Sequence, residues 1–169
     1  YYGMESGDDV VLKAVKKGVS GPEAIEAGKR VVEAGIKLSL MVIIGLAGAE
    51  GSDRHARETA RAINEIKPNM LSALTLMLYR GSELLDQYEK GEFAPLSPQG
   101  IMLELHKIIS LVELPPEGHC LFRSNHVSNY VQLAATLPKD KDRLLGQIAQ
   151  AADELGKWKD WDVYNNTRY

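Results

Sequence analysis

The alternation of apolar and polar positions divides the chain into short buried runs and longer amphipathic stretches. The run Leu38–Ile44 contains one polar residue, Ser39, and glycines bound it on both sides. This texture is typical of a strand buried on both faces of a parallel sheet. Met70–Leu78 has the same texture. Because ligands of parallel α/β folds lie at the carboxyl ends of the strands, we expect any chemistry where these two runs end.

The stretches between these runs carry apolar residues at helical spacing, with start and stop signals at their ends. The clearest start is Ser20–Glu23, a capping box with a proline near the first helical position. Asp8 is a second capping residue, and Gly18 is a stop. The predicted helices are Asp8–Lys17, Ser20–Ala34, Asp53–Ile66, Ser82–Lys90 and Ser97–Val112.

With a short strand at Tyr1–Met4, the order up to residue 112 is β-α-α-β-α-β-α-α. Strands that alternate with helices predict right-handed crossovers in one parallel sheet. Only about three strands are expected in this part, which leaves an open sheet edge that offers a surface for self-association. We therefore expect an α/β fold with further strands upstream of Tyr1.

The pattern changes after Pro115 and Pro116. It predicts a short strand at His119–Ser124, a polar loop at Asn125–Tyr130 and an amphipathic helix at Lys139–Leu155. We expect two parts in the chain, residues 1–113 and a mostly helical C-terminal extension over residues 114–169.

Composition excludes several classes of protein. The 169 residues are 44% hydrophobic, and the net charge is −3 without a basic face interleaved with aromatics, so no nucleic-acid signature is present. No run approaches the roughly 20 apolar residues that span a membrane, and no signal peptide is visible. The single cysteine, Cys120, cannot form an internal disulfide or hold a metal cluster alone. We expect a cytoplasmic protein.

Three segments of the chain resemble, in the right order, the radical S-adenosylmethionine (SAM) enzymes. Gly3–Asp8 resembles their fourth strand and its loop. Ile43–Gly48 resembles the fifth strand, whose usual form is I-I-G-L-P-G-E-T, and Leu76–Leu84 resembles the sixth strand, which often ends in a tyrosine followed by P-G-T-P-L. The resemblance covers residues 1–113. Cys120–Leu137 is similar to the C-terminal extension of relatives of MiaB, BchE and oxygen-independent coproporphyrinogen oxidase.

The resemblance implies a fold and a ligand. The fold is the C-terminal part of a parallel (βα)6 partial TIM barrel, which holds SAM at the carboxyl ends of its strands. A carboxylate and a serine hydroxyl suit ribose hydroxyls or the methionine part of SAM, and glycines let the backbone approach adenine. The implied SAM contacts are Glu5 and Ser6, the turn of Gly45, Leu46, Ala47 and Gly48, and Leu78 with Tyr79.

The departures from the family pattern limit what this chain does alone. The C-x-x-x-C-x-x-C loop, which holds a 4Fe-4S cluster in the family, is absent, and so is the G-G-E-type strand. Ala47 replaces the usual proline, and Glu50 stands one position later than the usual glutamate. In a complete parent the cluster reduces SAM and a 5′-deoxyadenosyl radical forms. The resemblance thus implies a chain that is not catalytically competent by itself.

Other interpretations remain open for the same residues. Glu5 and Ser6 also suit a turn that caps a helix, and Gly45 and Gly48 also suit a strand end. A rival class is a non-catalytic α/β module that binds a small molecule or an anion at residues 45–51 and the following helix start. A third is association through the open edge without a ligand.

The histidines and the cysteine match no trusted metal spacing. His55 and His106 lie on predicted helices without a second ligand, so we expect surface or packing roles for both. His119, Cys120 and His126 are close in sequence, but their spacing fits no zinc site and their role stays open.

Overall fold

The computed structural model describes residues 1–158 and shows one mixed sheet. Residues 159–169, which the sequence assigns to the C-terminal extension, lie outside the described residues. The strands stand in the sheet in chain order: β1 (Tyr2–Glu5), β2 (Ser39–Ile44), β3 (Met70–Thr75), β4 (Cys120–Ser124) and β5 (Leu133–Leu137). The pairs from β1 to β4 are parallel, and β5 is antiparallel to β4.

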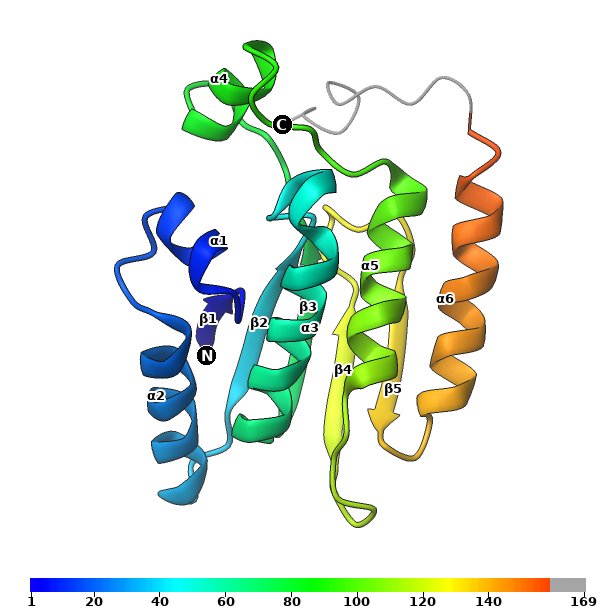
Figure 1. The fold of residues 1–169 in the computed structure, drawn as a ribbon. Coiled ribbons are helices and arrows are strands. Elements are labelled where there is room, and N and C mark those ends of the chain that lie inside the picture. Colours follow the sequence, from blue (N-terminus) through cyan, green and yellow to red (C-terminus); the bar gives the residue numbers. More distant parts are fainter. Residues whose placement is uncertain (159–169) are drawn as a thin grey trace.

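The helices of the described part are α1 (Asp9–Ala14), α2 (Gly21–Glu33), α3 (Gly48–Ile66), α4 (Glu83–Glu89), α5 (Pro98–Leu111) and α6 (Lys141–Leu155). Figure 1 shows α2, α3, α5 and α6 side by side as a layer over one face of the sheet. Parallel strands in sequential order with their helices on one side form an arc of a (βα) barrel. The predicted α/β fold of partial-barrel type is confirmed.

The core lies between the sheet and this layer of helices. Alternate residues of β2, Leu40, Val42 and Ile44, point into it, as the period of two in a strand requires. The same cluster runs without a break from Met4 of β1 to Leu155 of α6. Residues on both sides of position 113 therefore build one hydrophobic core.

One strand and several element boundaries differ from the sequence-based expectation. Leu133–Leu137 was not predicted as a strand, yet it pairs with β4 and raises the strand total of the described part to five. α3 begins at Gly48 instead of Asp53, because Gly45 (φ 87°) and Gly48 (φ 66°) reverse the chain within one turn. β3 ends at Thr75, before the predicted Leu78.

α4 stands apart from the main core, beyond the carboxyl ends of β2 and β3 (Figure 1). Its buried residue Leu85 packs with Leu78 in a separate cluster, whose half-buried members are Leu76, Leu84, Tyr88 and Phe93. An exposed ion pair joins Lys16 to Glu83 at 2.5 Å, and such pairs contribute little stability. α4 is thus held mainly by this satellite cluster.

Leu85→Ala is therefore expected to loosen α4 without unfolding the sheet. Hydrogen exchange of the α4 amides should accelerate by about tenfold or more, because local opening needs only the satellite cluster to separate. Amides of β2 should keep their protection. Leu105→Ala in the main core is the contrasting variant, and equal acceleration of the β2 amides by both variants would refute a separate cluster.

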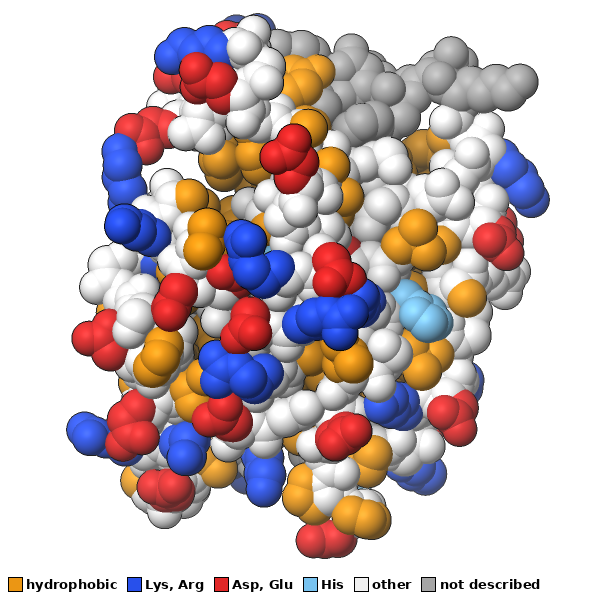
Figure 2. All heavy atoms as spheres, viewed as in Figure 1, with side chains coloured by type: hydrophobic (Ala, Val, Ile, Leu, Met, Phe, Trp, Pro, Cys, Tyr) orange, Lys and Arg blue, Asp and Glu red, His pale blue; other side chains and the backbone are white. Residues whose placement is uncertain are grey.

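The outer surface of the helical layer carries charges of both signs (Figure 2). Arg61 pairs with Glu58 and Glu65 along α3, and Asp53 pairs with Arg57 and with Lys107 of α5.

β1 is an edge strand of the sheet, because within the described chain it pairs with β2 on one side only. None of the described helices is long and apolar enough to cross a membrane.

Candidate functional site

The residues implied in SAM binding come together at one edge of the sheet. Because β1, β2 and β3 are parallel, their carboxyl ends meet at the same edge. Glu5 ends β1, Gly45 follows β2, and Leu78 with Tyr79 follows β3. This edge lies at the top of Figure 1. The tertiary structure thus gathers segments that stand more than 30 residues apart in the sequence.

Glu5 has a strained backbone at this edge. Its φ is 68°, a left-handed conformation that costs a residue other than glycine about 1–2 kcal/mol. The β1–β2 register shifts between Gly3 and Glu5. The Glu5 carboxylate bends back over Gly3, where an added Cβ would lie 2.4 Å from Oε1, and Lys17 Nζ is 3.3 Å away. The side chain stays 24% exposed. Strain of this kind is typical of residues that a ligand contacts.

Ser6 faces the helical layer and is fully buried. Its Oγ accepts a hydrogen bond from the Asp8 N–H at 2.9 Å and lies 2.8 Å from His55 Nδ1. Both hydrogen-bonding functions of the hydroxyl are therefore engaged by protein groups. Ser6 therefore stabilises the turn after β1, which is the alternative to SAM contact that the sequence analysis gave for this residue.

His55 of α3 joins the ends of β1 and β2. Its Nε2 lies 3.2 Å from the carbonyl oxygen of Ile43, which can only accept, so Nε2 carries the proton and Nδ1 accepts from Ser6. Burial lowers the pKa of His55 to about 4, so the ring is neutral at pH 7. Of the two roles expected for His55, surface or packing, its complete burial fits packing.

Glu104 of α5 holds the turn after β2, and sequence reasoning missed it. Its Oε1 accepts a hydrogen bond from the Gly45 N–H at 2.6 Å and lies 3.6 Å from His55 Nε2. Burial raises the pKa of Glu104 to about 7, an effect that Ser52 and Gly45 partly offset. Although Ser52 is close, Oε2 has no well-formed hydrogen bond among the described residues. The sequence signal that could have revealed Glu104 is a carboxylate at an inward position of an apolar helical stretch.

A second ion pair clamps the turn after β1 onto α3. Asp8 caps α1 by accepting from the Val10 N–H, as predicted, and its other oxygen accepts from Arg54 Nε at 2.6 Å. The Gly7 N–H donates to Thr59 Oγ1 at 3.1 Å. The position of Glu5 is thereby fixed relative to α3.

The turn from Gly45 to Gly48 is braced from the outside by the loop before α5. An added Cβ on Gly48 would lie 2.9 Å from both Ala94 O and the Phe93 ring, and the Ala49 N–H donates to Ala94 O at 2.7 Å. Leu46 is buried, and Ala47 caps α3 without a side-chain hydrogen bond. The N–H groups of Gly48 and Ala49 already donate to backbone carbonyls of the chain. Glu50 adds negative charge in the first turn of α3, so an anion is disfavoured here.

The two residues after β3 have different environments. Leu78 is buried in the satellite cluster with Leu85. Tyr79 is 50% exposed, and its hydroxyl lies 3.3 Å from Met77 Sδ. Of the pair, only Tyr79 is accessible to solvent and thus to a ligand.

Cys120 and the two neighbouring histidines do not share a site. Cys120 is buried in the core at the start of β4, where burial raises the pKa of its thiol to about 12. His126 follows the opposite end of β4, and its Nδ1 lies 2.9 Å from Ser128 Oγ. In residues 1–158 no group of three potential metal-ligating side chains occurs.

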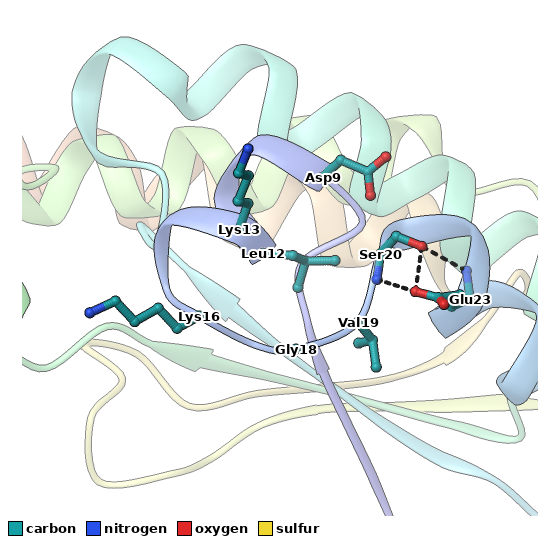
Figure 3. Close-up of a pocket in the computed structure, with 8 residues that line it drawn as sticks. All are labelled: Asp9, Leu12, Lys13, Lys16, Gly18, Val19, Ser20 and Glu23. Atoms are coloured by element: carbon teal, nitrogen blue, oxygen red, sulfur yellow. Dashed lines mark hydrogen bonds between the residues drawn. The ribbon is translucent and has the colours of Figure 1, made fainter.

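A hollow of about 490 Å³ lies beside α1 and the start of α2 (Figure 3). The Ser20 N–H donates to Glu23 Oε2 at 2.8 Å and the Glu23 N–H donates to Ser20 Oγ at 3.4 Å, which is the predicted capping box. The backbone N–H groups of Ser20, Gly21 and Glu23 at the start of α2 thus have hydrogen-bond partners within the chain. Two lysines, Lys13 and Lys16, and two carboxylates, Asp9 and Glu23, line this hollow, so its formal charge is balanced.

With this geometry in place, the chain can be compared with known proteins. No family model matches it. It is 30% identical over 139 residues to an uncharacterized protein of Methanocaldococcus jannaschii, covering 82% of this chain and 38% of that protein. It is 26% identical over 94 residues to the tRNA uridine(34) acetyltransferase of Methanocaldococcus infernus, covering 55% of this chain and 18% of that enzyme.

A solved structure of the archaeal Elp3 of Methanocaldococcus infernus, with an N-terminal deletion, superposes with a TM-score of 0.62. The match covers 91% of this chain and 35% of that one, at 18% identity. The chain shares this fold. In each match the chain spans less than two fifths of the relative's length.

The residues present fit the two implied cofactors differently. A 4Fe-4S cluster needs several thiolates, whereas the sequence has one cysteine, whose thiol is buried in the core. The residues of this chain therefore do not fit a 4Fe-4S cluster. For SAM the chain does offer a half-buried carboxylate, a glycine turn and an exposed tyrosine at one edge.

Proposed function

We propose that this chain forms the ribose and adenine side of a SAM pocket in a protein of the radical SAM superfamily. The observation that carries the proposal is Glu5, a carboxylate residue with a strained backbone at the carboxyl end of β1. In parallel α/β folds this edge is where ligands bind. When bound, SAM supplies the carbon–sulfur bond that such enzymes cleave. This chain's residues bind and orient it.

In this proposal Glu5 accepts hydrogen bonds from the ribose hydroxyls, since a carboxylate offers two acceptor oxygens. Lys17 orients the carboxylate through its ion pair. The Gly45–Gly48 turn and Tyr79 form the wall beside the base. Ser6 does not contact SAM, because its hydroxyl is buried. It supports the wall from behind through its hydrogen bond with His55. The chain alone does not cleave SAM, and its location is the cytoplasm.

The proposal is tested by following backbone amides of the isotope-labelled chain by nuclear magnetic resonance (NMR) while SAM is added. Half a pocket is expected to bind with a Kd of about 1 mM, which this method detects. Shifts should concentrate at Glu5, Gly45–Gly48 and Tyr79. Glu5→Gln should weaken binding about threefold to tenfold, because hydrogen bonds to a charged group are the stronger ones.

Glu26→Gln, an exposed charge on α2, is the matched control and should leave the SAM titration unchanged. Saturable shifts elsewhere on the chain, or none, would contradict the proposal. Inorganic phosphate serves as a second probe. Shifts at residues 45–51 with phosphate, but none with SAM, would instead support the anion-binding module.

We also propose self-association through β1, because this edge strand is unpaired on one side in the described chain. Strand edges of this kind pair readily with other strands. A concentration-independent monomer mass in light scattering would contradict it.

A further inference from the structure

We infer that Glu104 is a positioning residue that holds the Gly45–Gly48 turn in its ligand-ready conformation. The inference rests on the proposed function and extends it to a residue outside the strand-end motifs. Glu104 lies 59 positions from Gly45 in the sequence, on the helix that packs behind β2.

The first argument is the geometry at Gly45. The N–H of Gly45 donates to Glu104 Oε1 at 2.6 Å, which is short for a bond from an N–H donor. Gly45 has a φ of 87°, which is the point where β2 reverses into α3. A hydrogen bond at this residue therefore sets the direction of the whole turn.

The second argument is that α5 contacts Gly45 in two ways. Besides the hydrogen bond from Glu104, the Ile101 side chain packs against Gly45, and an added Cβ there would lie 2.6 Å from Ile101 Cδ1. One face of α5 thus fixes both the position and the orientation of this peptide. Any shift of α5 along the sheet is transmitted to the turn.

The third argument is burial. The Glu104 side chain has no exposed surface, and a carboxylate in such a place is costly unless it has partners. Its neighbours with titratable groups are His55 of α3 and, behind His55, Asp8 with Arg54. Glu104 and His55 therefore brace the ends of β2 and β1 from adjacent helices, beneath the Gly45–Gly48 turn and Glu5 of the proposed pocket.

The test compares Glu104→Gln, which keeps an acceptor oxygen, with Glu104→Leu, which does not. In NMR spectra the Gly45 amide proton should lie far downfield in the parent and in Glu104→Gln, and should move upfield in Glu104→Leu. The SAM affinity of Glu104→Leu should fall about tenfold, and that of Glu104→Gln by about twofold or less, since only the leucine variant leaves the Gly45 N–H unpaired.

Ile108→Val on the same helix is the control for general loosening of α5. It should leave both the Gly45 amide shift and the SAM affinity unchanged. No saturable SAM binding by the parent chain overturns the proposed function, and this inference with it. Parent binding that Glu104→Leu leaves unchanged overturns this inference alone.

Discussion

Phe122→Ala is expected to destabilise the entire described chain by about 4 kcal/mol, the usual range for removing a buried phenylalanine. Phe122 is fully buried on β4, where it stands opposite Leu71 of β3 and Ala135 of β5. The cavity left behind would open in the middle of the sheet. Because the core runs across position 113, β1, β2 and β3 should lose protection together with β4.

Urea denaturation followed by circular dichroism gives the free energy of unfolding, and hydrogen exchange shows which amides it covers. Leu121→Ala is the matched control, because Leu121 is 40% exposed on the same strand and should cost less than about 1 kcal/mol. Loss of protection confined to residues 114–158 would instead support two separate parts of the chain. That result would speak for the division at residue 113 predicted from the sequence.

Gly7→Ala is expected to cost about 3 kcal/mol or more, through overpacking against a helix backbone. An added Cβ would lie 2.3 Å from the carbonyl oxygen of Glu58 and 2.9 Å from Thr59 Cα. Backbone atoms of α3 cannot rotate away as a flexible side chain does. The turn after β1 must then move, and the hydrogen bond from Gly7 to Thr59 is lost with it.

Thermal unfolding of Gly7→Ala should show a clearly lower midpoint than the parent. Gly146→Ala is the opposite control, since Gly146 lies within α6 and its added Cβ meets nothing within 4 Å. Alanine is favoured over glycine in a helix by about 1 kcal/mol, so that variant should be slightly more stable than the parent. A parent-like midpoint for Gly7→Ala would refute the close approach of the β1 turn to α3.

The Gly7 contact also links stability to the proposed site. Glu5 precedes this turn by two residues, and Asp8 follows it with its ion pair to Arg54. A shift of the turn therefore displaces the Glu5 carboxylate relative to Gly45. Stability variants in this region should weaken SAM binding as well, whereas Leu121→Ala should not.

Local patterns in the sequence determined the elements that depend on near neighbours. The apolar runs predicted β2 and most of β3, because a strand covered on both faces admits few polar residues. The capping box of Ser20 and Glu23 and the cap at Asp8 were correct for the same reason, since their hydrogen bonds span two or three residues. The order of these elements was enough to predict a parallel α/β fold, whereas the partial-barrel type was implied by the resemblance to radical SAM enzymes.

Tertiary packing alone decided the contacts that build the candidate site. Ser6 meets His55, and Gly45 meets Glu104, across 49 and 59 positions of the chain. Neither pairing leaves a periodic signal, because each depends on how α3 and α5 pack over the sheet. The place of β5 was decided in the same way, since a short strand gains its hydrogen bonds only once β4 is in position. The sequence thus indicated the edge where we propose that a ligand binds, and the packing of α3 and α5 determined which side chains hold that edge in place.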